Sequence, residues 1–572
     1  MIFYDFEVFA YDWLVVLIEP DKARETVIAN DKEKLENYYS KNKREIWIGY
    51  NSRNYDQYIL KAILCGLNPK EMNDFIIVQG KPGWQFSQAI NYYFPLNNYD
   101  VMSRIDPSLK AFEGFMGNDI RESSVPFNIK RKLTPEELAE VIRYCRHDVE
   151  QTIEVFIKRK SDFEAQIGLL KMFNLPLSSI NKTKVQLAAQ ILEASPKTYT
   201  DEFNISFPDT MRIEKYKSVV DWYKNWGNRS YDKKLKIDVA GIPHVFGWGG
   251  VHGAREKYFG EGYFINMDVA SLYPSLMIRY NLLSRSCNPA KFKDIVETRL
   301  RYKKEKNPLQ APLKIVINGT FGASKDEKNP LYDPRQANNV TVYGQLLLLD
   351  LIEHLEPHCE IIQSNTDGIL VKMPDGGNEN VFFDLIDEIA GEWEDRTGLK
   401  LEFDEYRKVF QKDVNNYIIV DGDGHYKSKG AYVKELSDLD YDLAIVNRAL
   451  IEFMIHGVSV EKTITACNSL KDFQQVRKIS GKYDAIMHGN TVLPEKTVRC
   501  FASNNLSDGG LFKKHSATGR WAKIEGTPEH CFLVNYNVNG ADVPPTLNKQ
   551  WYIDLAKKRL EDFGFERNMT LW

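Results

Sequence analysis

The 572-residue sequence has few of the features that mark secreted or membrane proteins. Its seven cysteines are an odd number without any CxxC pair, which argues against a disulfide framework and a structural zinc site. The longest apolar runs, such as Leu346 to Ile352, are interrupted by Asp350 and are too short to cross a bilayer. Met1 runs directly into an apolar segment without a secretory pattern. We therefore expect a protein with no membrane segment that works in the compartment where it is made.

The sequence also lacks a strong excess of charge of either sign. With a formal net charge of −4, it gives no support from overall charge for a nucleic-acid partner. The distribution of charge along the sequence is more informative, because positions 291–325 carry nine Lys/Arg and three Asp/Glu. This stretch is either a solvated helix face or a surface for a polyanion. The length and the 43% apolar content predict a globular chain of three or four structural units.

The pattern of apolar and turn residues predicts mixed α/β structure. Up to about residue 165, short β-rich runs alternate with helical patterns. Thr134, Pro135 and Glu137 form a capping signature for a helix that extends to Lys160. Further along, the expected elements are a strand at 263–269, helices around Arg299 and Lys314 continuing through Gln345, a strand pair at 360–373, and helices at 442–456 and 550–562.

Four acidic residues near the N-terminus are candidates for a metal site. Asp5 and Glu7 lie two apart in a strand, so their side chains leave the same face, and Asp56 follows a turn. Tyr144 and Asp148 lie four apart on the capped helix. Four carboxylates can share a small volume only with compensating cations. Two Mg²⁺ ions about 4 Å apart are the usual compensation where a phosphodiester is hydrolysed.

Taken singly, each of these short motifs is common in unrelated proteins. Together and in this order they closely resemble the three motifs of the DEDD 3′→5′ proofreading exonucleases. The resemblance implies a ribonuclease H-like domain at residues 1–165, in which Tyr144 orients the attacking water. It also implies that Asn51 and Tyr55 contact a frayed single strand, with Phe6 or nearby aromatic rings stacking on its bases.

A second set of motifs begins at residue 266. The string NMDVASLYPS at 266–275 resembles motif A of family B DNA polymerases, DxxSLYPS. The resemblance implies metal binding by Asp268 and the carbonyl group of Val269. Ser271 and Leu272 would then offer backbone groups near a triphosphate. Tyr273 would pack under the sugar and exclude a 2′-hydroxyl group.

Residues of the basic stretch resemble motif B of the same family, KxxxNxxYG. Lys314, Asn318, Phe321 and Gly322 fall on one helix face, with Phe321 in place of the family's tyrosine. The resemblance implies that Lys314 holds the incoming triphosphate, and that Asn318 and Gly322 leave room for the nascent base pair. Upstream, Arg299 and Lys303 resemble further cations that grip the phosphates, and Arg301 and Lys304 are alternatives for these roles.

The string QSNTDG at 363–368 resembles motif C, whose usual core is DTD. Asn365 replaces the first acid, whereas Asp367 matches the family's main metal ligand. Two carboxylates from two strands, Asp268 and Asp367, suffice for a two-metal displacement by a primer 3′-hydroxyl.

Three weaker matches concern DNA contacts. Thr341 begins a segment resembling the template-side TxxGR, with Gln345 for the arginine. The glycines Gly249 and Gly250 resemble a linker whose amides touch template phosphates. The KxKG string at 427–430 resembles the segment that holds the primer terminus, with Lys427 and Lys429 as its cations. Tyr417 matches a further primer-contacting tyrosine, although Asn415 replaces its accompanying lysine.

From these resemblances we expect an α/β plus α+β multidomain chain, a ribonuclease H-like exonuclease followed by a right-hand palm, fingers and thumb. The expected division is exonuclease 1–165, connecting region 166–260, palm 261–290 and 326–437, short fingers 291–325, and thumb with C-terminal extension 438–572. The implied activity is DNA replication from a primer 3′-hydroxyl with 3′→5′ proofreading, in a compact bacteriophage-type enzyme. The implied ligands are primer-template DNA, dNTPs and two Mg²⁺ per site, with Mn²⁺ as a substitute.

The other expectations concern partners and location. We expect a monomer in the cytoplasm of a bacterial host, with replication accessory proteins such as a helicase and a single-strand binding protein. Asp268 and Lys314 are 46 positions apart, and Gly322 and Asp367 are 45 apart, so the fingers are short. This spacing favours a nucleic-acid primer over a protein primer, and it favours a partner or the C-terminal extension as the source of any high processivity.

Three alternatives remain at this stage. One is a protein-primed polymerase of the same family. The second is an exonuclease whose polymerase half is degenerate, which the residues Asn365, Phe321 and Asn415 favour. The third is a non-catalytic nucleic-acid-binding or structural protein, which two independent sets of metal-binding acids oppose.

Overall fold

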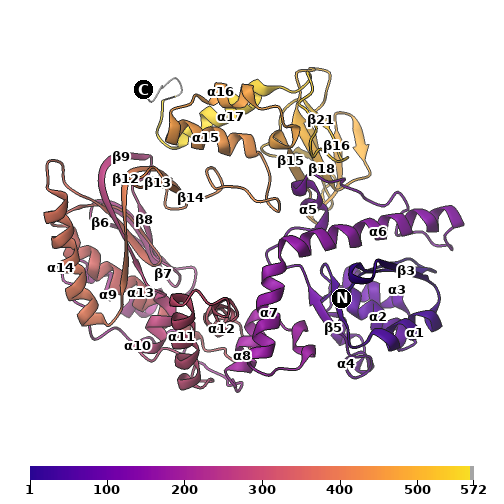
Figure 1. Ribbon diagram of the computed structural model, residues 1–572, viewed down its shortest axis with the longest axis horizontal. Helices are drawn as coiled ribbons and strands as arrows, with labels where there is room; N and C mark the ends of the chain where they lie inside the picture. Colours follow the sequence, from indigo (N-terminus) through magenta and orange to yellow (C-terminus); the bar gives the residue numbers. More distant parts are fainter. Residues whose placement is uncertain (567–572) are drawn as a thin grey trace. The chain divides into compact units, whose positions relative to one another are not determined.

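The structure is a computed structural model that describes residues 1–566, and the chain divides into two compact units (Figure 1). Unit 1 comprises Met1–Thr183, Leu436–Ile445 and Thr465–Tyr552; unit 2 comprises Lys184–Glu435, Val446–Ile464 and the chain from Ile553 onward. The block predicted as thumb and extension, 438–572, is therefore divided between the two units. Within the described residues, no helix combines the length and the apolar character that a membrane span requires.

Unit 1 is built on a five-stranded mixed sheet with the order β3-β2-β1-β4-β5. The first three strands pair antiparallel, and β1, β4 and β5 run parallel. The strands are β1 (Ile2–Val8), β2 (Trp13–Glu19), β3 (Arg24–Ala29), β4 (Ile46–Gly49) and β5 (Asn97–Asp100). One face of this sheet packs its apolar side chains with those of α1 (Lys32–Asn42) and α2 (Asp56–Leu64).

The long helix α6 (Pro135–Lys158) packs on β1 and β2. It carries Tyr144 and Asp148, two of the candidate residues from the sequence analysis. The predicted capping box is confirmed: Glu137 N donates to Thr134 Oγ1 at 3.2 Å, and Thr134 N donates to Glu137 Oε2 at 2.8 Å. These two hydrogen bonds satisfy backbone donors that the first helical turn leaves unpaired. Two further helices of this unit are α5 (Leu109–Met116) and α7 (Lys160–Met172).

The C-terminal part of unit 1 consists of two small antiparallel sheets with a shared apolar core. One has the order β15-β18-β21, and the other has the order β17-β16-β19-β20. Their strands are β15 (Gln475–Lys478), β16 (Tyr483–His488), β17 (Thr491–Leu493), β18 (Thr497–Ala502), β19 (Leu511–His515), β20 (Trp521–Lys523) and β21 (Cys531–Leu533). The sequence predicts that these residues belong to the thumb and C-terminal extension, whereas Thr465–Tyr552 belongs to the same compact unit as the N-terminal sheet.

A buried arginine joins this C-terminal part to helix α5. Arg499 of β18 is buried, and its guanidinium donates to the carbonyl groups of Gly114 at 3.0 Å and Asn118 at 2.7 Å. These carbonyls lie at and just beyond the C-terminal end of α5, where helix acceptors lack intrahelical partners and a cation is favoured. Gly114 is required by the close packing, because a Cβ atom there would lie 2.7 Å from Val476 Cγ1.

Unit 2 is built on a nine-stranded antiparallel sheet with the order β14-β13-β12-β9-β11-β10-β8-β7-β6. Its strands are β6 (Lys234–Val239), β7 (Ile242–Gly247), β8 (His252–Ala254), β9 (Tyr258–Val269), β10 (Glu360–Asn365), β11 (Gly368–Lys372), β12 (Leu401–Asp413), β13 (Asn416–Val420) and β14 (Tyr426–Lys429). The predicted strand at 263–269 and the strand pair at 360–373 are confirmed as β9, β10 and β11.

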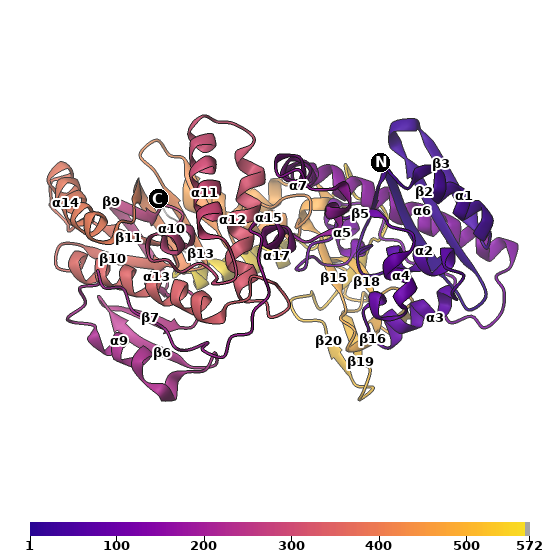
Figure 2. The same ribbon diagram turned by 90° about the horizontal axis from the view of Figure 1, so that it is seen from below.

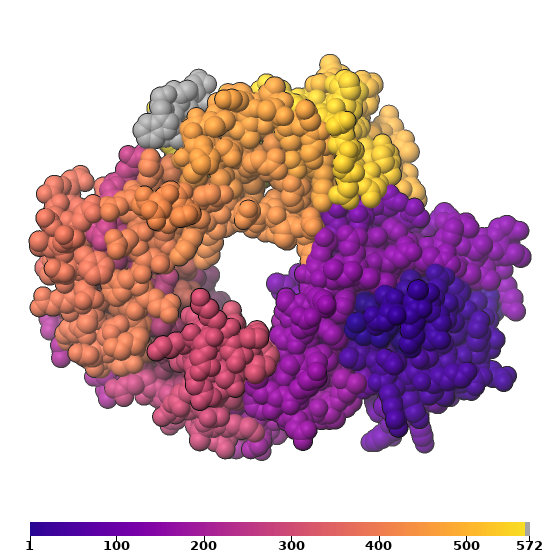
Figure 3. Space-filling view, in the orientation of Figure 1, coloured from indigo at the N-terminus to yellow at the C-terminus, as the bar shows by residue number. Residues whose placement is uncertain are grey.

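The helices of unit 2 include α8 (Lys184–Ile191), α9 (Lys217–Lys224), α10 (Leu272–Arg279), α11 (Pro289–Lys304), α12 (Gln310–Ser324), α13 (Pro334–Leu355) and α14 (Glu379–Thr397). The predicted helices near Arg299 and Lys314 are α11 and α12, and residues of this segment form a continuous surface lobe, rose in Figure 3. The expected continuation through Gln345 is a separate helix, α13, after a break at 325–333. The helices predicted at 442–456 and 550–562 are α15 (Ala444–His456) and α17 (Lys549–Asp562).

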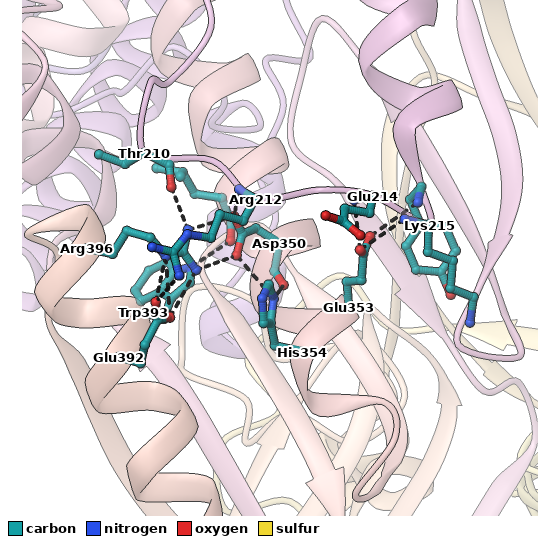
Figure 4. Close-up of polar contacts among 12 residues, drawn as sticks. Thr210, Arg212, Glu214, Lys215, Asp350, Glu353, His354, Glu392, Trp393 and Arg396 are labelled. Carbon is teal, nitrogen blue, oxygen red and sulfur yellow. Dashed lines mark hydrogen bonds and ion pairs between the residues drawn. The ribbon is translucent and has the colours of Figure 1, made fainter.

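Helix α13 is buried on nearly all sides, and its one buried carboxylate is paired (Figure 4). Asp350, the acid that interrupts the apolar run, accepts two hydrogen bonds from Arg396 of α14 at 2.8 and 2.9 Å, and one from the backbone of Arg212. Arg396 also donates to the carbonyl group of Thr210. A buried charge is tolerated only when paired in this way, so Asp350 ties α13, α14 and the segment near residue 212 together.

Candidate active sites

The first candidate site lies where β9 and β11 meet in unit 2. The register of this antiparallel pair sets Gly368 opposite Asp268, and Val269 N donates to the carbonyl group of Asp367 at 2.7 Å. The two predicted acids are therefore neighbours. Burial raises the pKa of Asp268, and the negative charge of Asp367 raises it further. Gly368 is necessary here, since a Cβ atom would lie 1.9 Å from Asp268 Oδ1.

Two polar residues beside Asp268 had no role assigned from the sequence. Asn266 donates to Asp268 Oδ2 at 2.8 Å, and Asp404 of β12 lies opposite Asn266 in the sheet. Lys427 of β14 donates to Asp404 at 2.8 Å. An adjoining cavity of about 120 Å³ is lined by residues that include Asp268, Asn266, Gln363, Asn365, Tyr417, Lys427 and Lys429. The predicted primer-side residues Tyr417, Lys427 and Lys429 thus border the same cavity as Asp268.

The turn after β9 directs Tyr273 toward helix α12. Ser271 has a left-handed backbone with φ 51° and precedes the first turn of α10. The ring of Tyr273 lies against that of Phe321, with centroids 4.4 Å apart and planes inclined at 38°. Burial raises the pKa of Tyr273, and the charge of Asp367 raises it further, so its hydroxyl group stays protonated. Leu272 is buried, so its side chain is not available to a ligand.

The predicted motif B residues occupy the exposed side of α12. Lys314, Asn318 and Gly322 are exposed and Phe321 is half-buried, whereas the opposite side packs inward. On α11, Arg299 is partly buried, its Nε atom has no hydrogen-bond partner, and burial lowers its pKa. Lys303 is exposed and lies 3.8 Å from Glu402. The alternatives Arg301 and Lys304 are also exposed.

The glycine segment before β8 approaches the turn between β10 and β11. A Cβ atom on Gly250 would lie 2.7 Å from Thr366 Oγ1, so only glycine allows this distance. Gln345, which replaces the family's arginine, donates to the carbonyl groups of Gly247 at 2.8 Å and Gly249 at 2.6 Å. The side chain of Asn365 accepts a hydrogen bond from Thr366 N at 2.9 Å and so shapes the turn.

Thr341 does not join this surface. It is 2% exposed, and its hydroxyl group donates to the carbonyl group of Asn338 at 2.9 Å within its own helix. The expectation that Thr341 contacts DNA is therefore corrected. The residue of this helical segment that lies next to the glycine loop is Gln345, whose buried side chain donates to the carbonyl groups of Gly247 and Gly249.

The second candidate site lies in unit 1, where β1, α2 and α6 meet. Asp5 and Glu7 share one face of β1, and Asp56 at the start of α2 accepts a hydrogen bond from Phe6 N at 3.0 Å. Asp148 of α6 completes the set, and all four carboxylates are buried or half-buried. Burial and their mutual charge raise the pKa of Asp5, and burial raises the pKa of Asp56 to about 7 and of Asp148 to about 6. The structure thus brings the four predicted acids into one electrostatically coupled cluster.

Lys110 of α5 is a member of this cluster that sequence reasoning missed. Its ammonium group forms a short ion pair with Asp148, another with the buried Glu113 at 3.0 Å, and lies 4.6 Å above the ring of Tyr144. These partners raise the pKa of Lys110 and keep it charged despite its burial. A lone lysine on a short helix carries no recognisable sequence signal, and only the packing of α5 against α6 reveals its role.

The remaining predicted residues surround this cluster. Asn51 has a left-handed φ of 60°, and its N–H donates to Asp100 at 2.8 Å, which orders the loop before α2. The hydroxyl group of Tyr55 donates to Asn73 at 2.8 Å. Tyr144 is half-buried, and burial raises its pKa. The expectation that Phe6 stacks on bases is wrong, because this ring is 2% exposed and belongs to the core.

One further donor lies beside the acids. The thiol of Cys145 approaches Asp5, and its sulfur lies within 4.8 Å of the carboxylates of Asp5 and Glu7. Burial raises the pKa of this thiol well above its usual value, so Cys145 is a neutral weak donor to Asp5. The oxygen donors of the acids are those that Mg²⁺ prefers.

Comparison with known proteins finds relatives for part of the sequence, and no family model matches. The chain is 24% identical over 311 residues to DNA polymerase 1 of Saccharolobus solfataricus, a match that covers 45% of this chain and 33% of the relative. It is 26% identical over 211 residues to DNA polymerase 1 of Aeropyrum pernix, covering 30% of this chain and 21% of that protein. The chain thus spans about a third or less of these curated relatives.

Among solved structures, the family B DNA polymerase of the hyperthermophilic archaeon Pyrobaculum calidifontis aligns with 100% of this chain and 78% of that chain. The alignment has 15% identity and a TM-score of 0.43. The sequence matches support a relationship to DNA polymerases over part of the chain.

Proposed function

We propose that this chain is a template-directed DNA polymerase of family B that carries a 3′→5′ proofreading exonuclease. The observation that carries the proposal is the pairing of β9 with β11, which makes Asp268 and Asp367 neighbours beside Tyr273. Partial similarity to two archaeal DNA polymerases supports it. In unit 1, the sheet order 3-2-1-4-5 and the coupled acids support a ribonuclease H-like exonuclease.

The acids of the polymerase site fit divalent cations. Burial raises the pKa of Asp268, and repulsion between its carboxylate and that of Asp367 raises it further, so a divalent cation held by these acids would relieve the repulsion. Asp268, Asp367 and the carbonyl group of Val269 would hold two Mg²⁺, with Mn²⁺ as a substitute. When bound, such ions activate the primer 3′-hydroxyl group and stabilise the charge of the leaving pyrophosphate.

The side chains around the acids divide into three sets by position. Lys314 of α12, with Arg299 and Lys303 of α11, is proposed to bind the triphosphate, since the charge of these cations complements its phosphates. Asn318, on the same side of α12, is proposed to lie against the bound dNTP and leave room for the nascent base pair. Tyr273 would lie under the sugar, supported by Phe321. The proposed DNA contacts are Gly249, Gly250 and Gly322 toward the template, and Tyr417, Lys427 and Lys429 toward the primer.

The nuclease site is proposed to use its four acids in the same way. Asp5, Glu7, Asp56 and Asp148 would hold two divalent cations, which lower the pKa of an attacking water and stabilise the leaving 3′ oxygen. Tyr144 would orient that water through its protonated hydroxyl group. Lys110 would neutralise part of the negative charge that develops on the phosphate. Asn51 and Tyr55 would contact the strand.

A primer-extension gel with matched and mismatched 3′ ends tests both halves. Asp268→Asn is expected to abolish dNTP incorporation and to leave removal of a mismatched end intact. Asp5→Ala combined with Glu7→Ala is expected to do the reverse. If the Asp268 variant incorporates dNTPs at the wild-type rate, the polymerase assignment is wrong.

The principal alternatives concern the primer and the polymerase half. A protein-primed enzyme of this family would attach a deoxynucleotide to a protein hydroxyl group, whereas we propose a nucleic-acid primer because of the short α11–α12 segment. If the chain is instead an exonuclease with a degenerate polymerase half, dNTP incorporation by the Asp367→Ala variant would equal that of the wild type. The bacteriophage setting is proposed from the motif resemblance and the compact chain, and helicase and single-strand binding protein are proposed partners.

A further inference from the structure

The four-stranded sheet β17-β16-β19-β20 has one packed face and one open face. Ile486 and Leu511 project into the apolar core shared with β15, β18 and β21, where both are fully buried. Because side chains alternate along a strand, their neighbours in sequence point to the other face. Figure 2 shows β16, β19 and β20 at the lower edge of the view, beyond β15 and β18.

The register defines what the open face carries. One row across the sheet consists of Val492, Met487, Phe512 and Lys523. The next row consists of Ala485, Lys514 and Trp521. All seven side chains are exposed or half-buried, with Val492 56% exposed and Trp521 37% exposed. Five apolar side chains, two of them aromatic, thus share one accessible sheet surface with two lysines.

The charge of this sheet has one predominant sign. Its strands carry three lysines against one acidic residue, Asp484. Lys514 and Lys523 lie on the open face, whereas Lys513 is opposite Ile486 on the packed face. Lys523 lies 3.9 Å from Glu529, and both side chains are well exposed, so solvent screens this pair. A positive surface with aromatic rings suits a ligand that presents both anionic groups and flat apolar rings.

We propose that this open face binds single-stranded DNA, with bases stacked on Phe512 and Trp521 and phosphates near Lys514 and Lys523. Unpaired bases present their π-faces to aromatic side chains on a sheet, and lysines follow the backbone. Rings in neighbouring strands suit successive bases of one strand. A duplex keeps its bases stacked internally, so it offers only phosphates to this face. The inference goes beyond the proposed function and requires neither active site to be catalytic.

The test is binding of a fluorescein-labelled dT12 to the full chain, followed by anisotropy at several salt concentrations. The chain carries Asp5→Ala and Glu7→Ala and is kept in EDTA, so that the oligonucleotide is not cut. A self-priming hairpin DNA is added in excess first, which occupies a polymerase cleft if there is one. In this background, Phe512→Ser combined with Trp521→Ser is expected to raise the Kd for dT12 by tenfold or more. Lys514→Ala with Lys523→Ala is expected to weaken binding and reduce its salt dependence.

Three controls keep the result interpretable. Tyr536→Ser removes a 68%-exposed aromatic ring of the same unit that lies outside the strands, and it is expected to leave the Kd unchanged. Trp521→Phe keeps a ring and is expected to retain binding while losing the quenching of Trp521 emission by dT12. Far-UV circular dichroism and thermal midpoints check that the variants fold, and a variant that misfolds is replaced by the lysine pair.

Several outcomes would overturn the proposal. One is an unchanged Kd in a folded Phe512/Trp521 double variant. Another is an equal loss of affinity for a 12-bp duplex, which would assign the surface to backbone contacts alone. A loss of self-association without a change in dT12 binding would identify the face as an interface between copies of the chain. Failure of primer extension would contradict the proposed polymerase function and leave this inference standing.

Discussion

Tyr273 and Phe321 lie ring against ring, 4.4 Å between centroids, although they come from different elements of unit 2. Tyr273 follows the strand that carries Asp268, and Phe321 lies on the helix that carries Lys314. The contact couples the turn beside the acids to the helix with the proposed triphosphate-binding cation. It also shows why phenylalanine serves at position 321: the contact is made by the ring.

Replacing Tyr273 by valine is expected to admit ribonucleotides. The smaller side chain opens the space in which a 2′-hydroxyl group would clash, so discrimination against ribonucleotides should fall on the order of 10–100-fold. The measurement is kcat/KM for a dNTP and the matching rNTP in an Asp5→Ala, Glu7→Ala background. Phe321→Tyr is the control and should leave the ratio unchanged, because the ring contact is kept. An unaltered ratio in Tyr273→Val would contradict the assigned role.

Replacing Lys110 by methionine is expected to reduce excision of a mismatched 3′ end by about 10²–10³-fold. The substitution removes the cation beside Asp148 and takes from the buried Glu113 its lysine partner, leaving it the hydrogen bond from Arg121 N. We therefore also expect a lower free energy of unfolding, by about 3 kcal/mol at neutral pH. Single-turnover excision and denaturant unfolding measure the two effects.

Two control variants accompany Lys110→Met, one at the same position and one at an exposed lysine elsewhere in unit 1. Lys110→Arg keeps the charge and is expected to retain part of the activity. Lys160→Ala breaks an exposed pair with Glu164 and is expected to change neither quantity. Full excision by Lys110→Met would exclude Lys110 from the nuclease site.

The stability of the metal-free chain is expected to fall as pH rises from about 4 to about 7. The pKa of Asp56 is about 7 and that of Asp148 about 6 in the folded chain, both raised by burial above the value of 3.8 for an exposed carboxyl group. The folded state therefore binds more protons than the unfolded state in this range, and stability is lost as those protons dissociate. We expect a loss on the order of 1–3 kcal/mol.

Thermal or denaturant unfolding in EDTA at pH 4, 5, 6, 7 and 8 measures this dependence. Mg²⁺ is expected to restore stability at pH 7–8, because it binds the ionised acids of the folded state. Asp56→Asn is expected to flatten the profile. A stability that rises over the same range in EDTA would be inconsistent with the coupled acids.

Replacing Arg499 by methionine is expected to destabilise unit 1 by about 3–5 kcal/mol. The change removes the side-chain donor to the buried carbonyl group of Asn118 and one of the two donors to that of Gly114, which keeps its hydrogen bond from Gly117 N. Because α5 also carries Lys110, excision should decrease well below the unfolding temperature. Urea unfolding and excision assays measure both effects, with Arg520→Met, an exposed arginine of the same unit, as the control. Unchanged stability would show that the C-terminal sheets do not support α5.

Much of both sites follows from local sequence. The capping box at Thr134, the strand with Asp5 and Glu7, and the helix stripe of Lys314 and Asn318 each depend on spacing within one element, and the structure has those elements. Motif resemblance added the expectation that Asp268 and Asp367 meet, and the β9–β11 register is what brings them together.

Other features depend on contacts between residues far apart in the sequence. Thr341 and Phe6 have polar or aromatic side chains suited to a DNA contact, yet burial removes both from any surface. Lys110 reaches Asp148 only because α5 packs against α6, and α5 is held by Arg499, some 385 residues further along. Local patterns report which face of an element is apolar, and they carry no information on its neighbours.

The sequence by itself determined the two groups of acids, the basic helix face, and the strands and helices that carry them, because these depend on side-chain chemistry and on periodicities of 2 and 3.6 residues. Tertiary structure alone decided that residues 465–552 belong with the first unit, that a lysine neutralises one acid cluster, and that Phe512 and Trp521 share an open sheet face. The physical reason is that charge coupling and burial depend on distances in space, which strand register and helix packing set.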